Sequence, residues 1–337
     1  MRWKFITAFA CVITLTALSC GGDKRKAVVV AAPFGPLAYP LVYMAENHDT
    51  AVFPEPIELK IWKNPDQLRA MIAGEQADFF AVPTNVAAVF HNKGVDFRLT
   101  AVSVWSVLWV VSSDSTKTTL DDFTGEEIVM PFRGDMPHIV FANLARQRGL
   151  NPDADFSLRF VNTPQDAVQQ LLMGRADHAV LCEPDISILF HASEVRGNAG
   201  TPSREFLRAV DLQEEWDAVY HTGEEIPIGG IAITGATAEN PRLIEKFLGE
   251  YARAIDWCEN HPTETGRLTT RFFEGVEPEP IEEAMGHVRQ KFVAARDARQ
   301  SVETFFTVLR EGNPATIGGS LPGDGFYWDN TGKTNQP

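Results

Sequence analysis

The chain has 337 residues, with 45 acidic and 30 basic side chains, which gives a formal net charge of −15 at pH 7. This acidic balance argues against a nucleic-acid-binding protein, because such proteins need a basic surface to neutralise phosphates. The length exceeds that of a typical single core and predicts two domains or lobes.

Residues 1–20 have the pattern of an export signal. Arg2 and Lys4 precede an apolar run from Phe5 to Leu18, which is too short to cross a bilayer, where about 20 residues are needed. Small residues then lead to Cys20, and this pattern resembles the lipobox of bacterial lipoproteins. The resemblance implies a lipid on Cys20 and a place in the bacterial cell envelope, anchored to a membrane and facing the periplasm or the cell exterior. The alternative is a plain secretory signal followed by an unrelated cysteine.

Residues 27–91 and 126–191 follow the same predicted order, in which strand and helix alternate three times. In the second strand of each half, apolar residues alternate with polar ones, as expected of a half-buried strand. The next helix begins at Asn64-Pro65 in one half and at Thr163-Pro164 in the other, an N-cap residue followed by proline. Alternating strands and helices predict an α/β fold with a mostly parallel sheet in each half.

A shared signature follows that helix in both halves. Gly74 and Gly174 stand where a left-handed residue is expected to end the helix. Asp78 and Asp177 come next and are expected to tie down a loop rather than to contact a ligand. A continuous apolar run then predicts a strand that is covered on both faces.

The remaining elements interrupt the repeat. The segments 97–102 and 107–111 are predicted strands, and the second of them is interpreted as the exit strand of the first half. A short apolar strand over 228–234 is expected to return to it. The rest of the chain predicts three helices, at residues 241–259, 281–296 and 302–310, and an irregular tail over 315–337.

The cysteines and histidines do not form a recognisable metal or cofactor motif. Cys11 is lost with the signal, and Cys182 and Cys258 fall in a predicted strand and a predicted helix. We expect these two to be unpaired thiols. The sequence has no CxxC, HExxH or P-loop pattern, so we predict no metal site, no cofactor and no enzyme activity.

With these features, the chain resembles the solute-binding proteins of ABC importers, in the nitrate/sulfonate/taurine and thiamine-pyrimidine-precursor group. The resemblance covers nearly the whole chain after residue 27 and depends on the order and spacing of its motifs. These are Ala32-Pro33-Phe34-Gly35-Pro36-Leu37, Gly74-x-x-Ala77-Asp78, Val82-Pro83-Thr84-Asn85, Leu120–Gly125 with Ile128–Pro131 and Gly134, and Gly174-x-Ala176-Asp177 with Glu183-Pro184.

The resemblance implies the type II periplasmic-binding-protein fold, with two lobes and two crossover strands that act as a hinge. Lobe 1 would comprise residues 21–113 and 228–337, and lobe 2 residues 114–227. The implied partners are a small-molecule ligand, a permease and an ATPase. We expect a monomer that is held to the membrane through its lipid.

Ligands of open parallel sheets bind outside the carboxyl ends of the strands, where helices begin. This rule selects loops in both halves, and we predict that they form a cleft between the lobes. The predicted ligand-binding residues are Phe34, Gly35, Tyr39, Thr84, Asn85, Trp105, Phe132, Arg133, Gly134, Glu183 and Asp185.

Several of these residues also have a purely structural interpretation. The glycines could serve tight turns, Thr84 and Asn85 could cap their helix, and Glu183 could stabilise a helix N-terminus. Arg133 would suit an anion by bidentate bonding, although an exposed loop arginine is the commoner case.

The aromatic residues favour a planar heterocycle as ligand, whereas Arg133 and the helix N-termini favour an anion such as a sulfonate or nitrate. We weight these nearly equally, with a slight preference for a small organic ligand. An enzyme on the same scaffold, such as a pyrimidine-precursor synthase, and a ligand-sensing lipoprotein for a signalling partner stay open as alternatives.

Overall fold

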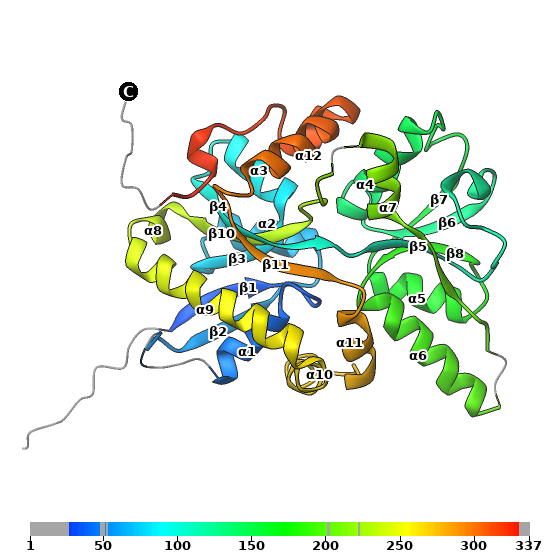
Figure 1. Ribbon diagram of the computed structural model, residues 1–337, viewed down its shortest axis with the longest axis horizontal. Coiled ribbons are helices and arrows are strands. Elements are labelled where there is room, and N and C mark those ends of the chain that lie inside the picture. The colour runs from blue at the N-terminus through cyan, green and yellow to red at the C-terminus, as the bar shows by residue number, and fades with distance from the viewer. Residues whose placement is uncertain (1–26, 48–50, 52, 201–202, 222, 330–337) are drawn as a thin grey trace, which may run out of the picture.

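The computed structural model of the chain describes residues 27–47, 51, 53–200, 203–221 and 223–329. These residues form two α/β lobes that lie side by side, each with its own sheet (Figure 1). The signal segment and Cys20 lie outside the described residues.

Lobe 1 is built on a six-stranded sheet with the order β11-β4-β10-β3-β1-β2. Its strands are β1 (Val28–Ala32), β2 (Ile57–Ile61), β3 (Phe79–Pro83), β4 (Phe97–Ser106), β10 (Gly229–Thr234) and β11 (Arg289–Ala294). Its helices are α1 (Tyr39–Asn47), α2 (Pro65–Ala73), α3 (Thr84–Asn92), α8 (Gly235–Ala238), α9 (Pro241–Asn260), α10 (Pro262–Thr269), α11 (Pro278–Met285) and α12 (Arg299–Gly312). Two 3₁₀ turns follow, η2 (Pro314–Ile317) and η3 (Asp324–Phe326).

Lobe 2 is built on a five-stranded sheet with the order β7-β6-β8-β5-β9. Its strands are β5 (Leu108–Ser112), β6 (Glu127–Pro131), β7 (Ser157–Val161), β8 (His178–Cys182) and β9 (Leu207–Asp211). Its helices are α4 (Met136–Gln147), α5 (Pro164–Leu172), α6 (Asp185–Asn198) and α7 (Leu212–Tyr220), and a 3₁₀ turn, η1 (Leu120–Phe123), precedes β6. In Figure 1, α5 and α6 cover one face of the sheet, and α4 and α7 lie on the other.

The predicted repeat is confirmed. The order β1-α1-β2-α2-β3-α3 recurs as β6-α4-β7-α5-β8-α6, and in each set the first strand pairs in parallel with the other two. The helix starts also agree, because the side chains of Asn64 and Thr163 accept hydrogen bonds from the backbone three residues on, with proline at the first helical position.

The expected α/β fold with mostly parallel sheets is confirmed in strand direction, because four of the six strands of lobe 1 and four of the five strands of lobe 2 run the same way. Both sheets are nevertheless mixed. In lobe 1, β10 runs antiparallel to β3 and β4, and β11 runs antiparallel to β4. In lobe 2, β5 runs antiparallel to β8 and β9. The parallel pairings come from the repeat, and each antiparallel pairing involves a strand from the segments that interrupt it.

Three local expectations need correction. The segment 107–111 was expected to be the exit strand of lobe 1, but β5 pairs with β8 and β9 in lobe 2, so the chain changes sheets at Val107. Residues 289–294, expected to be helical, form β11, which covers the outer edge of β4. Gly74 has φ −93°, and the positive φ in that turn falls on Glu75 instead.

The core of lobe 1 lies between its sheet and α9. Phe79 on β3 stacks on Phe247 of α9, with ring centroids 3.7 Å apart, and Phe247 in turn lies 6.2 Å from Tyr251. All three side chains are fully buried. This packing fixes β3, and with it the loop at its carboxyl end, by burial of large aromatic surface.

Gly230 marks a close approach between β10 and β4, at the strand by which the chain returns to lobe 1. A Cβ atom built on Gly230 would overlap the carbonyl oxygen of Ala101 and lie 2.9 Å from its carbonyl carbon. Both obstacles are backbone atoms in the centre of the sheet, so no side-chain movement can relieve the clash.

We therefore expect Gly230→Ala to destabilise the protein by more than about 3 kcal/mol, because β10 must move away from β4. Urea unfolding followed by circular dichroism measures this. The matched control is Gly249→Ala, in the middle of α9, where nothing lies within 4 Å of the added Cβ. There we expect a gain of up to about 1 kcal/mol from helix propensity. Equal urea midpoints for wild type and Gly230→Ala would contradict the close approach.

Candidate functional site

Two of the predicted loops meet where the lobes face each other. The loop between β1 and α1 carries Gly35, and the loop between β8 and α6 carries Glu183 and Pro184. Gly35 has φ +122°, and a Cβ atom on it would lie 3.6 Å from Pro184 Cδ and 3.9 Å from the Glu183 carbonyl oxygen. The positive φ favours glycine at this position, and a Cβ atom here would be in van der Waals contact with the loop of lobe 2. The first loop of one lobe thus lies against the third loop of the other.

Glu183 anchors the loop of lobe 2. Its side chain is buried, and its Oε2 accepts hydrogen bonds from the backbone N–H of Ser187 at 3.1 Å and from the Ser187 hydroxyl at 2.9 Å. Its Oε1 accepts from Arg208 Nε at 2.8 Å. The expected structural role of Glu183 is therefore present, because its carboxylate satisfies an N–H group in the first turn of α6.

Arg208 connects this anchor to lobe 1. From β9, its guanidinium reaches both Glu183 and, at 3.2 Å, Glu283 Oε1 on α11. Helices α6 and α11 also pack against each other at this point. Burial raises the pKa of Glu183, and the nearby Arg208 opposes that shift. Arg208 therefore links a buried carboxylate of lobe 2 to a half-exposed one of lobe 1.

Asp185, at the first position of α6, is the second buried carboxylate of this loop. Only 6% of the residue is exposed, and its Oδ1 accepts a hydrogen bond from Gln165 Nε2 at 3.1 Å. Within the described part of the chain, no lysine, arginine or histidine forms an ion pair with it. Burial, reinforced by the charge of Glu183, raises its pKa from 3.8 to about 7.

Tyr39 faces this acidic loop from lobe 1, at the first position of α1. The residue is 1% exposed, and its hydroxyl is buried with no hydrogen-bond partner among the described residues. Burial raises its pKa, and the charges of Glu183 and Asp185 raise it further. Phe34 lies next to it in the same cluster and packs on Phe273 with ring centroids 4.9 Å apart. Phe34, Gly35, Tyr39, Glu183 and Asp185 are thus brought together.

Thr84 and Asn85 begin α3, but neither caps it as expected. The Thr84 backbone N–H donates to the carbonyl of Ile228, and its hydroxyl donates to that of Pro227 at 2.6 Å. Asn85 Nδ2 donates to the carbonyl of Thr316 at 3.2 Å, while its buried Oδ1 has no partner among the described residues. These residues attach α3 to the segments that return to lobe 1.

Phe132, Arg133 and Gly134 form the corresponding loop before α4, at a second meeting place of the lobes. The Arg133 guanidinium is exposed and lies 4.0 Å from the ring centroid of Phe160. Gly134 N–H donates to His138 Nδ1 at 3.1 Å. A groove of about 180 Å³ separates α4 from η2, lined by Gly134, His138, Ile139, Ala142, Asn143, Arg146, Asn313, Ala315 and Thr316. This loop therefore borders a groove of its own.

Trp105 is held against β11. Its Nε1 donates to the carbonyl of Lys291 at 3.1 Å, and the Lys291 ammonium lies 4.9 Å from the ring centroid. The residue is buried and packs in the main core. These contacts give Trp105 a structural role.

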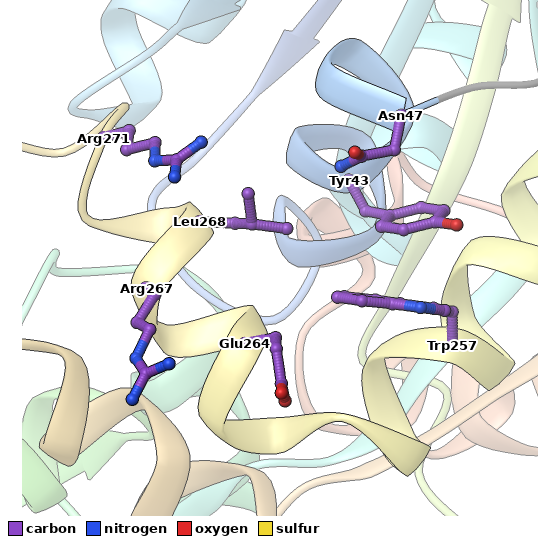
Figure 2. A pocket seen from close by; sticks show the side chains of 7 residues that line it. All are labelled: Tyr43, Asn47, Trp257, Glu264, Arg267, Leu268 and Arg271. Atoms are coloured by element: carbon purple, nitrogen blue, oxygen red, sulfur yellow. The ribbon is translucent and has the colours of Figure 1, made fainter.

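A larger pocket lies on lobe 1 alone, between α1, α9 and α10, and has a volume of about 400 Å³. Figure 2 shows Tyr43 and Trp257 on one side of it and Arg267 and Arg271 on the other. The Trp257 ring is already stacked on both faces, 4.2 Å from Tyr43 and 4.6 Å from His261. Arg271 is paired with Glu46 at 3.5 Å. Residues of lobe 2 do not line this pocket.

Sequence reasoning missed Arg208, Glu283 and Gln165, which complete the site. In the strand LRAVD, Arg208 lies between Leu207 and Ala209, a pattern that by itself predicts a side chain pointing away from the apolar face. Glu283 and Gln165 lie on helix surfaces and carry no signal of a partner. Their roles depend on contacts between residues that are distant in sequence.

The expectation of two unpaired thiols is confirmed, since Cys182 and Cys258 are both free. Burial raises the pKa of each thiol, which keeps them protonated. Across residues 27–329, as far as they are described, no three histidine, cysteine, aspartate or glutamate side chains are arranged to hold a metal ion. In the same residues no helix is long and apolar enough to cross a membrane.

The raised pKa of Asp185 predicts how the stability of the ligand-free protein depends on pH. The folded state holds the Asp185 proton more tightly than the unfolded chain, so the stabilising contribution is present below pH 4 and is lost as the pH rises to about 7. Asp185→Asn removes this dependence. Relative to wild type, we expect the variant to gain at most about 4 kcal/mol at pH 8 and nothing below pH 4.

The measurement is urea unfolding of both proteins across this pH range. Asp177→Asn is the control of opposite sign, because the hydrogen bond from Arg204 lowers the pKa of Asp177. That variant should lose stability at pH 8, with a smaller effect because Asp177 is exposed. Parallel pH profiles for wild type and Asp185→Asn would contradict the environment described for Asp185.

Comparison with known proteins agrees with this architecture. Residues 43–199 match the family model described as the periplasmic phosphonate substrate-binding protein of ABC transporters. No curated protein matches the chain.

Solved structures resemble the chain over most of its length. An ABC transporter protein of Parabacteroides distasonis is 21% identical, with a TM-score of 0.70, covering 91% of this chain and all (100%) of the other. The aliphatic sulphonate-binding protein SsuA of Escherichia coli is 16% identical, with a TM-score of 0.64, covering 84% and 92%. The nitrate-binding protein NrtA of Synechocystis PCC 6803 is 14% identical, with a TM-score of 0.63, covering 87% and 84%.

At these identities the solved structures show a shared fold, and the family model adds the relationship in sequence. Together with the two lobes and the loops that meet between them, these findings show that the chain has the fold of periplasmic substrate-binding proteins and that its residues 43–199 are similar in sequence to the phosphonate-binding proteins of ABC transporters.

Proposed function

We propose that this binding protein captures a small organic solute between its two lobes and delivers it to a membrane permease that is driven by an ATPase. The observation that carries the proposal is the contact of the Gly35 loop of lobe 1 with the Glu183-Pro184 loop of lobe 2. Both loops follow the carboxyl ends of parallel strands, where open α/β sheets bind ligands. A ligand that contacts both loops favours the closed arrangement over the open one.

The hinge would lie where the chain passes between the sheets, near Val107 and in the segment 223–228. Arg208 supports this arrangement, because separation of the lobes breaks its contact with Glu283 while the contact with Glu183 stays within lobe 2. The protein is proposed to act as a monomer, since each chain contains both walls of the cleft. Because β5 belongs to the sheet of lobe 2, we place the first boundary between the lobes at Val107 instead of residue 113.

The names of the related proteins mention phosphonate, sulphonate and nitrate. These compounds, together with pyrimidines and other small heterocycles, form the first set of solutes to test. Catalysis is not part of the proposal. Cys182, which lies beside the acidic loop, has a buried thiol with a raised pKa and is therefore a poor nucleophile.

The test is a thermal-shift screen of residues 21–337 against these solutes, followed by calorimetry. A solute at a hundred times its Kd should stabilise the protein by about 2.7 kcal/mol. Gly35→Val then locates the site, because the larger side chain would collide with Pro184 when the lobes close. We expect it to weaken binding at least about tenfold.

Gly94→Val is the matched control for Gly35→Val. Gly94 also has a positive φ, +84°, but nothing lies within 4 Å of its added Cβ. Both variants place a β-branched residue at a positive φ, whereas only Gly35→Val is expected to affect closure. Equal affinity of both variants for the solute would place binding outside the interlobe cleft.

We further propose that Cys20 carries the lipid that holds the protein at the bacterial cell envelope. The apolar segment before Cys20 and the small residues around it support this. Cys20→Ser should abolish labelling by a clickable palmitate analogue and release the protein into the soluble fraction. Cys11→Ser, within the segment that is removed, is the control and should leave labelling intact. A Cys20→Ser protein that is still labelled and membrane-bound would refute the lipid anchor.

A further inference from the structure

Asp185 and Tyr39 are buried polar groups from opposite lobes. Among the described residues, Asp185 has a hydrogen bond from Gln165 but no cationic partner, and the Tyr39 hydroxyl has no hydrogen-bond partner. We propose that the ligand carries a protonated amine that binds between the Asp185 carboxylate and the Tyr39 hydroxyl. This inference rests on the proposed capture of a small solute between the lobes and names the chemical group that the cleft recognises.

The first argument is charge. The Arg208 guanidinium pairs with two carboxylates beside this loop, those of Glu183 and Glu283. Asp185 is left without a cation among the described residues. A buried carboxylate is costly unless it is protonated or paired. A cationic ligand would pair with it.

The second argument is hydrogen bonding. The Tyr39 hydroxyl is buried and has no partner among the described residues. Tyr39 begins α1 four residues after Gly35, whose Cβ position lies 3.6 Å from Pro184 Cδ, and Pro184 directly precedes Asp185. An ammonium group has three donors, and both a carboxylate and a phenol oxygen can accept from it. One ammonium would therefore satisfy both groups, whereas a tertiary or quaternary cation has too few donors.

The third argument is that an anion does not fit this position. Helix N-termini bind anions through unsatisfied N–H groups, but at α6 the N–H of Ser187 already donates to Glu183. A sulfonate or phosphonate placed here would also face the negative charges of Glu183 and Asp185. These charges would exclude it as effectively as they attract a cation.

The fourth argument separates an ammonium from a metal ion. A hard divalent cation needs six or more oxygen ligands, usually several of them carboxylates. Here Glu183 is already engaged by Arg208 and Ser187, and the described residues form no cluster of three or more candidate metal ligands. Asp185 and Tyr39 alone suit an ammonium better.

The experiment compares solutes in pairs that differ only by an amine. The pairs are 2-aminoethylphosphonate with ethylphosphonate, taurine with ethanesulfonate, and β-alanine with propionate. Each is measured by thermal shift and calorimetry at pH 8, where Asp185 is mostly ionised. In at least one pair, we expect the amine to bind about tenfold or more tightly than its partner.

Variants then assign the preference to the two residues. Asp185→Asn and Tyr39→Phe should each reduce the affinity for the amine about tenfold while leaving that for the amine-free partner unchanged. Tyr39→Phe removes a hydroxyl without a partner, so we expect no loss of melting temperature. Glu215→Gln is the control, since Glu215 is a buried carboxylate that pairs with Arg148 on the far side of lobe 2's sheet from α6.

Each outcome decides one of the two proposals. If an amine-free anion binds as tightly as its amine, the amine inference fails and the proposed capture of a solute stands. The same holds if Asp185→Asn leaves the amine preference unchanged. If no solute from these pairs or from the wider screen binds, both proposals fail. A loss of binding in Glu215→Gln equal to that in Asp185→Asn would also overturn the assignment to Asp185.

Discussion

The contact between Glu183 and Arg208 is the constraint on which the geometry of the cleft depends. It places a carboxylate at the start of α6 and keeps it there by burial, by the guanidinium and by the first turn of the helix. Because Arg208 comes from β9, the contact fixes the loop after β8 to the edge of its own sheet. The same guanidinium reaches Glu283 of lobe 1, so the position of this loop and the approach of the lobes are coupled.

The two halves of the chain use one scaffold for different tasks. In lobe 1, the loop after the first strand carries Gly35 and leads to Tyr39. Gly35 lets the loop of lobe 2 approach closely, and Tyr39 contributes a phenol but no charge. In lobe 2, the loop after the third strand carries two carboxylates. Because the repeat places both loops at the carboxyl ends of their strands, closing the lobes brings unlike surfaces together. A repeated fold thereby makes an asymmetric site.

The features that the sequence predicted correctly are mostly local in sequence. The caps at Asn64 and Thr163 each depend on hydrogen bonds within one turn, and the apolar run of β8 depends on its own composition. Asp78 was expected to tie down a loop, and it accepts a hydrogen bond from the Val29 N–H at 2.8 Å. Such interactions are visible in a short window of residues.

The errors concern residues whose partners lie elsewhere in the fold. β11 forms because the edge of β4 provides a partner strand, which outweighs the helical tendency of its sequence. Thr84 does not cap α3, because the returning segment at Pro227 takes its hydroxyl. Arg208 and Glu283 lie 75 residues apart in the chain, so no local pattern could link them. A topological rule selected the Gly35 and Glu183 loops, which the structure brings together, while their ion pairs could be seen only in the structure.

The charge of the cleft limits how far the ligands named for similar proteins can be assumed for this chain. Several helix N–H groups that an anion would need are already used within the protein: Ser187 donates to Glu183, Gly134 to His138 and Thr84 to Ile228. At the α6 end of the cleft, by contrast, the Asp185 carboxylate has no cationic partner among the described residues. A shared fold with sulphonate- and nitrate-binding proteins therefore does not imply a shared ligand, because specificity depends on which groups remain unpaired when the lobes close. At the loops that meet between the lobes, the Tyr39 hydroxyl has no hydrogen-bond partner among the described residues, and Asp185 has no cationic one.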